Sequence, residues 1–396
     1  MAEENGLVTY LRDTADIEEF ADEARKEGIV ALDAEFIRER TYFPQLALIQ
    51  VATTKRSVLI DPVEGADLTA IEDLVLDADV VKILHAASQD LEIFYYRTGK
   101  IPRNIFDTQL AGSLCGLGHQ SSYAAMIERT TGVFLKKGES YTDWLRRPLS
   151  KKQEQYALDD VRYLHQAYDV LRERLTGFGR LAWAMEEMVR YEDISYFDTP
   201  SATLFRKVKR FGTLDPKALA ILRELAVWRE NEAKTRDKPR RSIIADETLV
   251  EIARAAPHSA DDLSRMRGLH PREVNRSAKA ILGVVEVGLS VAEDQRPKVG
   301  KKERLTPEGE AMVDLLQAVL RALCRVVEVA PPVVANAKDV ENLVRDHFQG
   351  GCEESECALL SGWRRELVGK ELVRFIEGEV SVHLDPTTGG PKFTDR

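Results

Sequence analysis

Residues 29–36, Ile-Val-Ala-Leu-Asp-Ala-Glu-Phe, place two acids inside a segment that is otherwise typical of a buried β-strand. Residues 29–32 form the near-continuous apolar run of a strand covered on both faces. Side chains two residues apart project from the same side of a strand, so Asp33 and Glu35 lie together. Two buried like charges are unfavourable unless a counter-charge compensates them. The segment therefore predicts a sheet that carries a divalent-cation site, with acids at a solvated strand end as the alternative.

The first 175 residues alternate strand and helix signals, which is typical of an α/β domain with a mixed sheet flanked by helices. Strands are expected at residues 29–36, 46–52, 57–60 and 80–84, and the short connection 53–56 predicts a hairpin. Helices are expected at residues 11–27, 88–96, from 108, from 122, and 150–175. Ser150 is the expected N-cap of the last helix, and a polar loop, 132–147, precedes it.

Strand signals nearly vanish after residue 205, and helical patterns replace them. The charged segment 295–305, which contains Pro297 and Gly300, predicts a linker between two helical blocks. The expected domains are an α/β domain, a first helical domain, a second and divergent helical domain, and a flexible tail, at residues 1–205, 206–294, 295–384 and 385–396.

Charge is distributed unevenly along the chain. The formal net charge is −10, but residues 206–241 contain 12 Lys and Arg against 5 Asp and Glu, a local charge of +7. A basic segment inside an acidic protein can hold a polyanion. The alternative is a solvated helix face whose cations pair with acids of the same chain.

Composition also bears on the compartment. Four scattered cysteines fit a reducing cytoplasm better than a disulfide framework, and Cys352, Cys357 and His347 lack the spacing of a zinc site. The acidic N-terminus lacks the features of a signal peptide. The longest nearly apolar stretch, 280–292, is too short to span a bilayer. We therefore expect a cytoplasmic protein with no membrane partner.

Further acids stand at positions that make them candidates for the same site. Asp90 follows an apolar run and opens a helix. In the expected long helix, Tyr156 precedes Asp159 by three residues and Asp160 by four, so spacing alone does not choose between the two aspartates. The alternatives are a helix cap for Asp90, a half-buried aromatic for Tyr156 and a solvated helix face for the aspartates. Asp107 is expected to cap a helix or to orient a neighbouring group.

The order Asp-x-Glu, then Asp, then Tyr-x3-Asp resembles the motifs of the DEDDy 3′–5′ exonucleases, and most closely the ribonuclease D family within them. The resemblance covers roughly residues 6–175, and whole phrases carry it, at residues 32–36, 42–46, 48–50, 85–91, 106–109, 143–149 and 156–161. The Tyr-x3-Asp motif selects Asp160 over Asp159. Tyrosine at position 156 places the chain in the tyrosine branch of these enzymes.

The resemblance implies a ribonuclease H-like exonuclease fold and a hydrolytic site. Asp33, Glu35, Asp90 and Asp160 would hold two divalent cations, Mg²⁺ or Mn²⁺, and hard cations of this kind take carboxylate oxygens. Tyr156 would orient the attacking water, because an unperturbed tyrosine pKa of about 10 makes it a poor base.

The matched phrases also contain candidate contacts for an RNA 3′ end, namely Gln45, His85 and Trp144. Trp144 could stack on a base or ribose, with a core aromatic as the alternative. His85 is expected to be structural rather than a metal ligand. Asp107 would orient the neighbouring catalytic groups.

The helical half resembles HRDC domains, clearly in residues 225–268 and more weakly in residues 315–369. Taken with the nuclease motifs, this implies a metal-dependent 3′–5′ exoribonuclease that releases 5′-mononucleotides. The expected substrates are tRNA precursors and other small structured RNAs with a free 3′ end, and the expected state is a monomer. The alternatives are a DNA-directed 3′–5′ exonuclease and an RNA-binding scaffold with an inactive nuclease fold.

Overall fold

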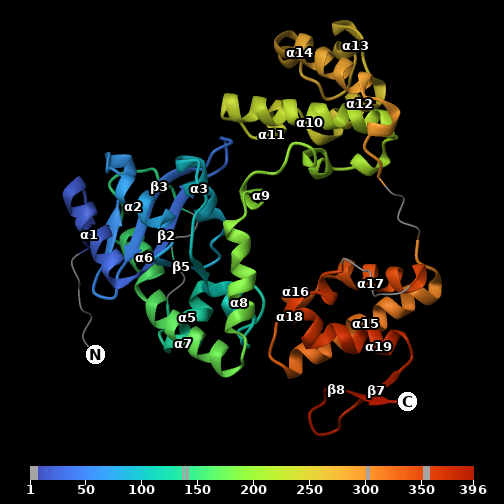
Figure 1. The fold of residues 1–396 in the computed structure, drawn as a ribbon. Helices are drawn as coiled ribbons and strands as arrows, with labels where there is room; N and C mark the ends of the chain where they lie inside the picture. Colours follow the sequence, from blue (N-terminus) through green and yellow to red (C-terminus); the bar gives the residue numbers. More distant parts are fainter. Residues whose placement is uncertain (1–7, 136–137, 139–141, 300–303, 351–356) are drawn as a thin grey trace.

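The computed structural model describes residues 8–135, 138, 142–299, 304–350 and 357–396. Its N-terminal part is built on a six-stranded mixed sheet with strand order β1-β4-β3-β2-β5-β6 (Figure 1). The central strand β2 runs antiparallel to β3 and parallel to β5. The strands are β1 (Tyr10–Leu11), β2 (Ile29–Ile37), β3 (Gln45–Ala52), β4 (Ser57–Ile60), β5 (Val81–Leu84) and β6 (Ile105–Asp107). The expected hairpin is confirmed, because β3 and β4 pair antiparallel.

Helices pack around this sheet and confirm the expected α/β architecture (Figure 1). Helix α6 contacts β2, β3 and β4, and α7 contacts β2 and β5. The helices are α1 (Thr14–Glu27), α2 (Thr69–Leu76), α3 (Ser88–Thr98), α4 (Thr108–Ser113), α5 (Tyr123–Thr131), α6 (Lys151–Arg162), α7 (Leu164–Gly177) and α8 (Leu181–Met188).

The single helix expected over residues 150–175 is wrong, because α6 ends at Arg162 and α7 begins at Leu164. The Tyr123 hydroxyl donates to the Asp159 carbonyl at 2.6 Å and accepts from the Tyr163 N–H. These two backbone groups would bond each other in an uninterrupted helix. A side chain inserted into the ladder separates the two helices. The periodicity of residues 150–175 could not reveal this break, because it depends on a side chain from another segment of the chain.

The second half is helical, as expected. Its first domain contains α10 (Pro216–Arg236), α11 (Arg240–Ile243), α12 (Asp246–Ala255), α13 (Ala260–Ser264) and α14 (Pro271–Ser290). The second contains α15 (Pro307–Val326), α16 (Pro331–Val334), α17 (Ala337–Gln349), α18 (Gly362–Arg364) and α19 (Lys370–Ile376). The connection from α8 to α10 carries η2 (Val189–Glu192), α9 (Ile194–Phe197), η3 (Leu204–Lys207) and η4 (Phe211–Thr213). No helix in the described ranges is both long and apolar enough to cross a membrane.

The C-terminal residues differ from the expected flexible tail. Strand β8 (Pro391–Asp395) pairs antiparallel with β7 (Val380–Leu384). The Phe393 ring lies edge-on to Phe375 of α19, with 6.5 Å between their centroids. This tertiary contact compensates for the Gly, Pro and Thr content that suggested an unstructured end.

The two helical domains contact the α/β domain at different places. In the first, Asp237 accepts hydrogen bonds from the backbone N–H groups of Tyr42 and Phe43, at 2.9 and 3.0 Å. In the second, Trp363 stacks on Trp183 of α8, with 5.0 Å between their centroids. One apolar cluster extends from the sheet through α8 into the second helical domain.

Candidate active site

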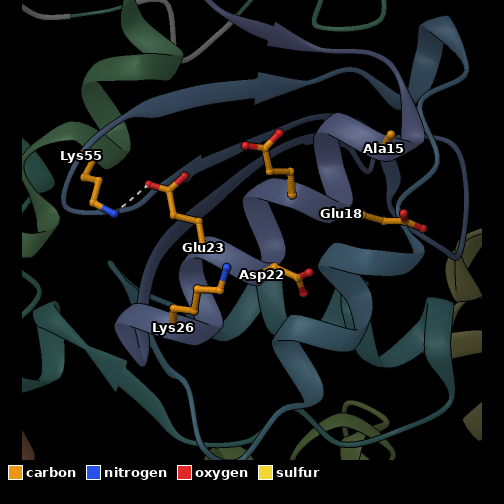
Figure 2. Close-up of a pocket in the computed structure, with 7 residues that line it drawn as sticks. Ala15, Glu18, Asp22, Glu23, Lys26 and Lys55 are labelled. Carbon is orange, nitrogen blue, oxygen red and sulfur yellow. Dashed lines mark ion pairs between the residues drawn. The ribbon is translucent and has the colours of Figure 1, made fainter.

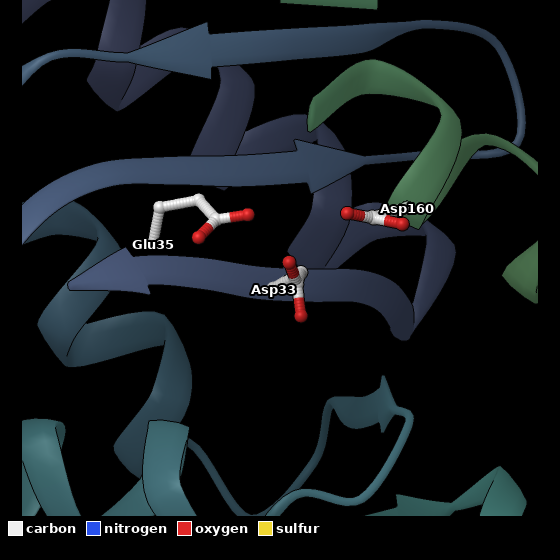
Figure 3. A group of neighbouring side chains, drawn as sticks. All are labelled: Asp33, Glu35 and Asp160. Atoms are coloured by element: carbon white, nitrogen blue, oxygen red, sulfur yellow. The ribbon is translucent and has the colours of Figure 1, made fainter. Parts of the chain in front are cut away.

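Three acidic side chains meet at β2. Asp33 and Glu35 come from this strand and Asp160 comes from α6, and each offers a carboxylate oxygen within 4.8 Å of the other two. Figure 3 shows the three side chains turned toward one another. The structure thus brings together three of the four carboxylates that the sequence singles out.

The fourth, Asp90, lies beside this group rather than within it. It sits in the first turn of α3, and its side chain is buried. Burial raises the pKa of Asp90 well above the usual range, and the charge of Asp33 raises it further. Asp90 is therefore an electrostatic neighbour of the group of three.

The clustering disfavours full ionisation of the acids. Burial raises the pKa of Asp33 to about 7. Burial, followed by the charges of Asp33 and Asp160, raises the pKa of Glu35 to about 9. The pKa of Asp160 is also raised, chiefly by burial and Asp33. A hard divalent cation prefers such oxygen donors and would offset their repulsion, so these residues fit a metal site.

Helix α6 resolves the choice between the adjacent aspartates. Asp160 points to the acidic group and accepts a hydrogen bond from Tyr156, which opposes the rise in its pKa. The carboxylate of Asp159 instead accepts from Gln155 at 2.8 Å and from Arg162 at 3.3 Å. A capping box between Ser150 and Gln153 begins the helix, which confirms Ser150 as the N-cap.

Two residues that precede α6, Gly138 and Trp144, lie against Tyr156. A Cβ atom at Gly138 would lie 1.9 Å from Tyr156 Cδ2, so only glycine fits there without displacing the ring. On another side, the Trp144 ring centroid lies 6.0 Å from that of Tyr156. These contacts restrict where the phenol of Tyr156 can point.

Of the three residues expected to contact RNA, His85 is hydrogen-bonded within the protein and Trp144 is buried. Both ring nitrogens of His85 lie 3.0 Å from internal partners, the Thr108 hydroxyl and the Ser121 carbonyl. Trp144 is only 2% exposed, which favours the core-aromatic alternative over base stacking. Gln45 is exposed at the start of β3 and lines a surface groove of about 440 Å³.

Asp107 connects several elements. It caps α4 through the Gln109 and Leu110 N–H groups and also accepts from the Ala86 and Ala87 N–H groups at 3.0 and 3.1 Å. The Tyr191 hydroxyl donates to it at 2.7 Å. Asp107 therefore fixes the loop that leads into α3 and Asp90, as an orienting residue would.

The sequence did not predict two residues that hold the segments around the acidic group in place. One is Tyr123, whose hydroxyl separates α6 from α7 next to Asp160. The other is Arg147, which holds the nearly buried Asp61 through two contacts of 2.5 and 2.6 Å and donates to the Ala47 carbonyl at 2.7 Å. Arg147 thereby fixes the loop before α6 to the sheet. Arg147 lies in one of the phrases that resemble the family, so this resemblance could have indicated its importance. Tyr123 lies in none of these phrases.

A different hollow, of about 510 Å³, lies on the outer face of α1 (Figure 2). Glu18, Glu19, Asp22 and Glu23 line it with Lys26 and Lys55. Lys55 pairs with Glu23 at 3.7 Å. This is an open, acidic helix surface, distinct from the three-carboxylate group on β2.

The chain is similar to known proteins along most of its length. Residues 8–176 match the 3′–5′ exonuclease family, and residues 218–285 match the HRDC domain family. The chain is 37% identical to ribonuclease D of Bartonella henselae, over 96% of this chain and 93% of that protein. It is 34% identical to ribonuclease D of Pseudomonas paraeruginosa, over 93% and 98%. A crystal structure of Escherichia coli RNase D, described as an exoribonuclease involved in structured RNA processing, superposes with a TM-score of 0.80 at 29% identity, covering 94% of this chain and 99% of that one.

Proposed function

The chain belongs to the ribonuclease D family of 3′–5′ exoribonucleases, and we propose that it matures the 3′ ends of tRNA precursors and other small structured RNAs, releasing 5′-mononucleotides. The observation that carries this proposal is the convergence of Asp33, Glu35 and Asp160 on one point of the sheet, with Asp90 beside them. The E. coli relative, which acts in structured RNA processing, supports the substrate class.

Two divalent cations, Mg²⁺ or Mn²⁺, are the proposed cofactors. Asp33, Glu35 and Asp160 would hold them, with Asp90 completing the set from α3. Bound cations of this kind generate a water-derived nucleophile and stabilise the charge that develops on the phosphate. The raised pKa values of the acids support this assignment, since the group favours bound positive charge, as protons or as metal.

Tyr156 is proposed to position the reacting groups. Its hydrogen bond to Asp160 favours the ionised form of that carboxyl group, and a phenol that donates a hydrogen bond remains protonated. The Gly138 backbone and the Trp144 ring limit its movement. Tyr156 therefore orients water or substrate by hydrogen bonding rather than by removing a proton.

We propose that a single chain acts alone and that it acts in the cytoplasm. All four carboxylates come from one chain, so no second copy is needed to complete the site. Cys115 and Cys324 are buried thiols, which is consistent with a reducing compartment.

The test is trimming of a tRNA precursor that carries an extended 3′ tail. With Mg²⁺ or Mn²⁺ we expect stepwise shortening from the 3′ end, with mononucleotides as the product, and with chelator we expect none. A DNA strand of the same sequence is the control. Trimming that persists in chelator would contradict the metal assignment, and faster digestion of DNA would favour a DNA-directed enzyme.

A further inference from the structure

Four exposed cations gather in the short connection between α9 and α10. Arg206, Lys207, Lys209 and Arg210 lie in residues 204–210, which we call the basic turn. Among the residues that the structure describes, none of the four side chains forms a close ion pair with an acid, although Lys209 interacts electrostatically with Asp246. The Lys207 side chain donates to the Thr199 hydroxyl, and Arg206 lies over the Phe205 ring.

The basic turn is anchored rather than loosely attached. Its apolar residues Leu204, Phe205 and Val208 are buried in the core of the first helical domain. The Lys209 backbone N–H also donates to Asp246 Oδ2 at 3.0 Å. Apolar and basic residues interleave, so burial of the first set forces the second outward. The backbone that carries the four cations is thus held in place before any ligand binds.

The rest of the basic segment 206–241 is mostly neutralised internally. Arg229 pairs with Asp246 at 2.7 Å, and Arg236 pairs with Glu273 at 2.9 Å. Lys234 and Arg240 pair with Asp198 and Glu230. The local excess of positive charge is therefore concentrated at the basic turn rather than along α10.

The position of the basic turn suits a substrate that must reach the acidic site. In Figure 1 the yellow-green segment that leads into α10 lies below this helix, on the side toward the α/β domain and the second helical domain, whereas α13 and α14 lie above it. Helix α10 packs directly against both η3 and α14.

We propose that the basic turn binds the phosphodiester backbone of the RNA substrate upstream of its 3′ end, while that end occupies the acidic site. This inference rests on the proposed function. Lysine and arginine contacts to phosphate position a nucleic acid without reading its sequence. The basic turn would therefore raise affinity for long or structured RNA of any sequence and leave the hydrolytic step unchanged.

The experiment replaces all four cations of the basic turn in the full-length chain, as R206Q/K207Q/K209Q/R210Q. Glutamine removes the positive charge but keeps a polar side chain, and it leaves the buried anchors in place. For a tRNA precursor in about 0.1 M salt, we expect KM to rise about tenfold or more, and the salt dependence of binding to weaken by about three in log–log slope. For a short oligonucleotide we expect kcat to stay within about twofold of wild type.

The matched control removes four exposed cations from α14 and the turn before it, as R267Q/R272Q/R276Q/K279Q. These residues belong to a different element from the basic turn. We expect its KM and salt slope to remain close to wild type. Equal losses in both variants, or a loss only in the control, would overturn the proposal. Wild-type protein that trims neither substrate would instead contradict the proposed function, so the two failures are distinguishable.

Discussion

Asp159 and Asp160 are neighbours in the chain, yet at the residue scale their surroundings differ. Only Asp160 joins the acidic group, while Asp159 binds Gln155 and Arg162. We expect Asp160→Asn to lower kcat by roughly a hundredfold or more, because it removes a charged oxygen donor. Asp159→Asn should stay within about twofold of wild type. Single-turnover trimming of a short RNA measures both. Comparable losses in the two variants would contradict the assignment.

The raised acid pKa values predict how stability depends on pH without metal. Unfolded carboxyl groups have pKa values near 4, whereas those of Asp33 and Glu35 are about 7 and about 9 in the folded chain. The folded state therefore binds more protons than the unfolded state across this window. The contribution of these two acids to stability is greatest at low pH and is lost as pH rises through these two values.

Thermal unfolding in chelator should accordingly show Tm decreasing from pH 6 to pH 9. Glu35→Gln removes one of the titrating groups and should flatten the decrease. Mg²⁺ should raise Tm more at pH 9 than at pH 6, because it competes with fewer protons. A Tm that rises with pH in wild type relative to Glu35→Gln would contradict the assigned direction.

The sequence predicted Asp33, Glu35 and their shared face because strand periodicity depends on local spacing alone. It left Trp144 open between base stacking and a core position, and it expected a structural His85 without identifying the partners of that ring. Those depend on segments that approach from elsewhere, such as Thr108 and Ser121.

At the scale of elements, the break between α6 and α7 places the end of a helix beside the acidic group. We expect Tyr123→Phe to let the Asp159 carbonyl and the Tyr163 N–H bond each other, which would shift Asp160. The expected result is a kcat reduced by about tenfold with an unchanged KM for short RNA, and a higher cation concentration for half-maximal rate.

Tyr168→Phe is the matched control, since it makes the same substitution on α7, where the hydroxyl accepts from Arg172 at 3.2 Å. It should leave kcat and the cation requirement unchanged. If Tyr123→Phe keeps the wild-type cation requirement and kcat, the inserted hydroxyl does not position Asp160.

Most elements of the sheet domain could be predicted, because their apolar residues recur with a clear period. The short strands β1 and β6 could not, since two or three residues carry no periodic signal. The division of the predicted helix 150–175 likewise required knowledge of a residue on α5.

At the scale of the whole molecule, the second helical domain and the α/β domain share an apolar core. Trp363 stacks on Trp183 and donates to Glu187 at 3.2 Å. We expect Trp363→Ala to lower the free energy of unfolding by about 3–5 kcal/mol and to separate the unfolding of the two domains. Calorimetry should then show two transitions in place of one.

Phe348→Ala is the control within the same domain, because this side chain is 54% exposed. It should change the free energy of unfolding by about 0.5 kcal/mol or less. If Trp363→Ala has no larger effect than this control, the interface does not couple the two domains. The sequence predicted two helical blocks but not their contacts, which join residues more than a hundred positions apart.

The hydrogen bonds from Tyr42 and Phe43 to Asp237 bear on whether the parts of this chain can be exchanged. The loop that contains Tyr42 continues directly from the strand that carries Asp33 and Glu35, and Asp237 ends α10 in a left-handed backbone conformation. A chimaera that grafts the first helical domain onto another nuclease would need this aspartate, its backbone geometry and a matching loop. The loop and the helix end would therefore have to be exchanged together.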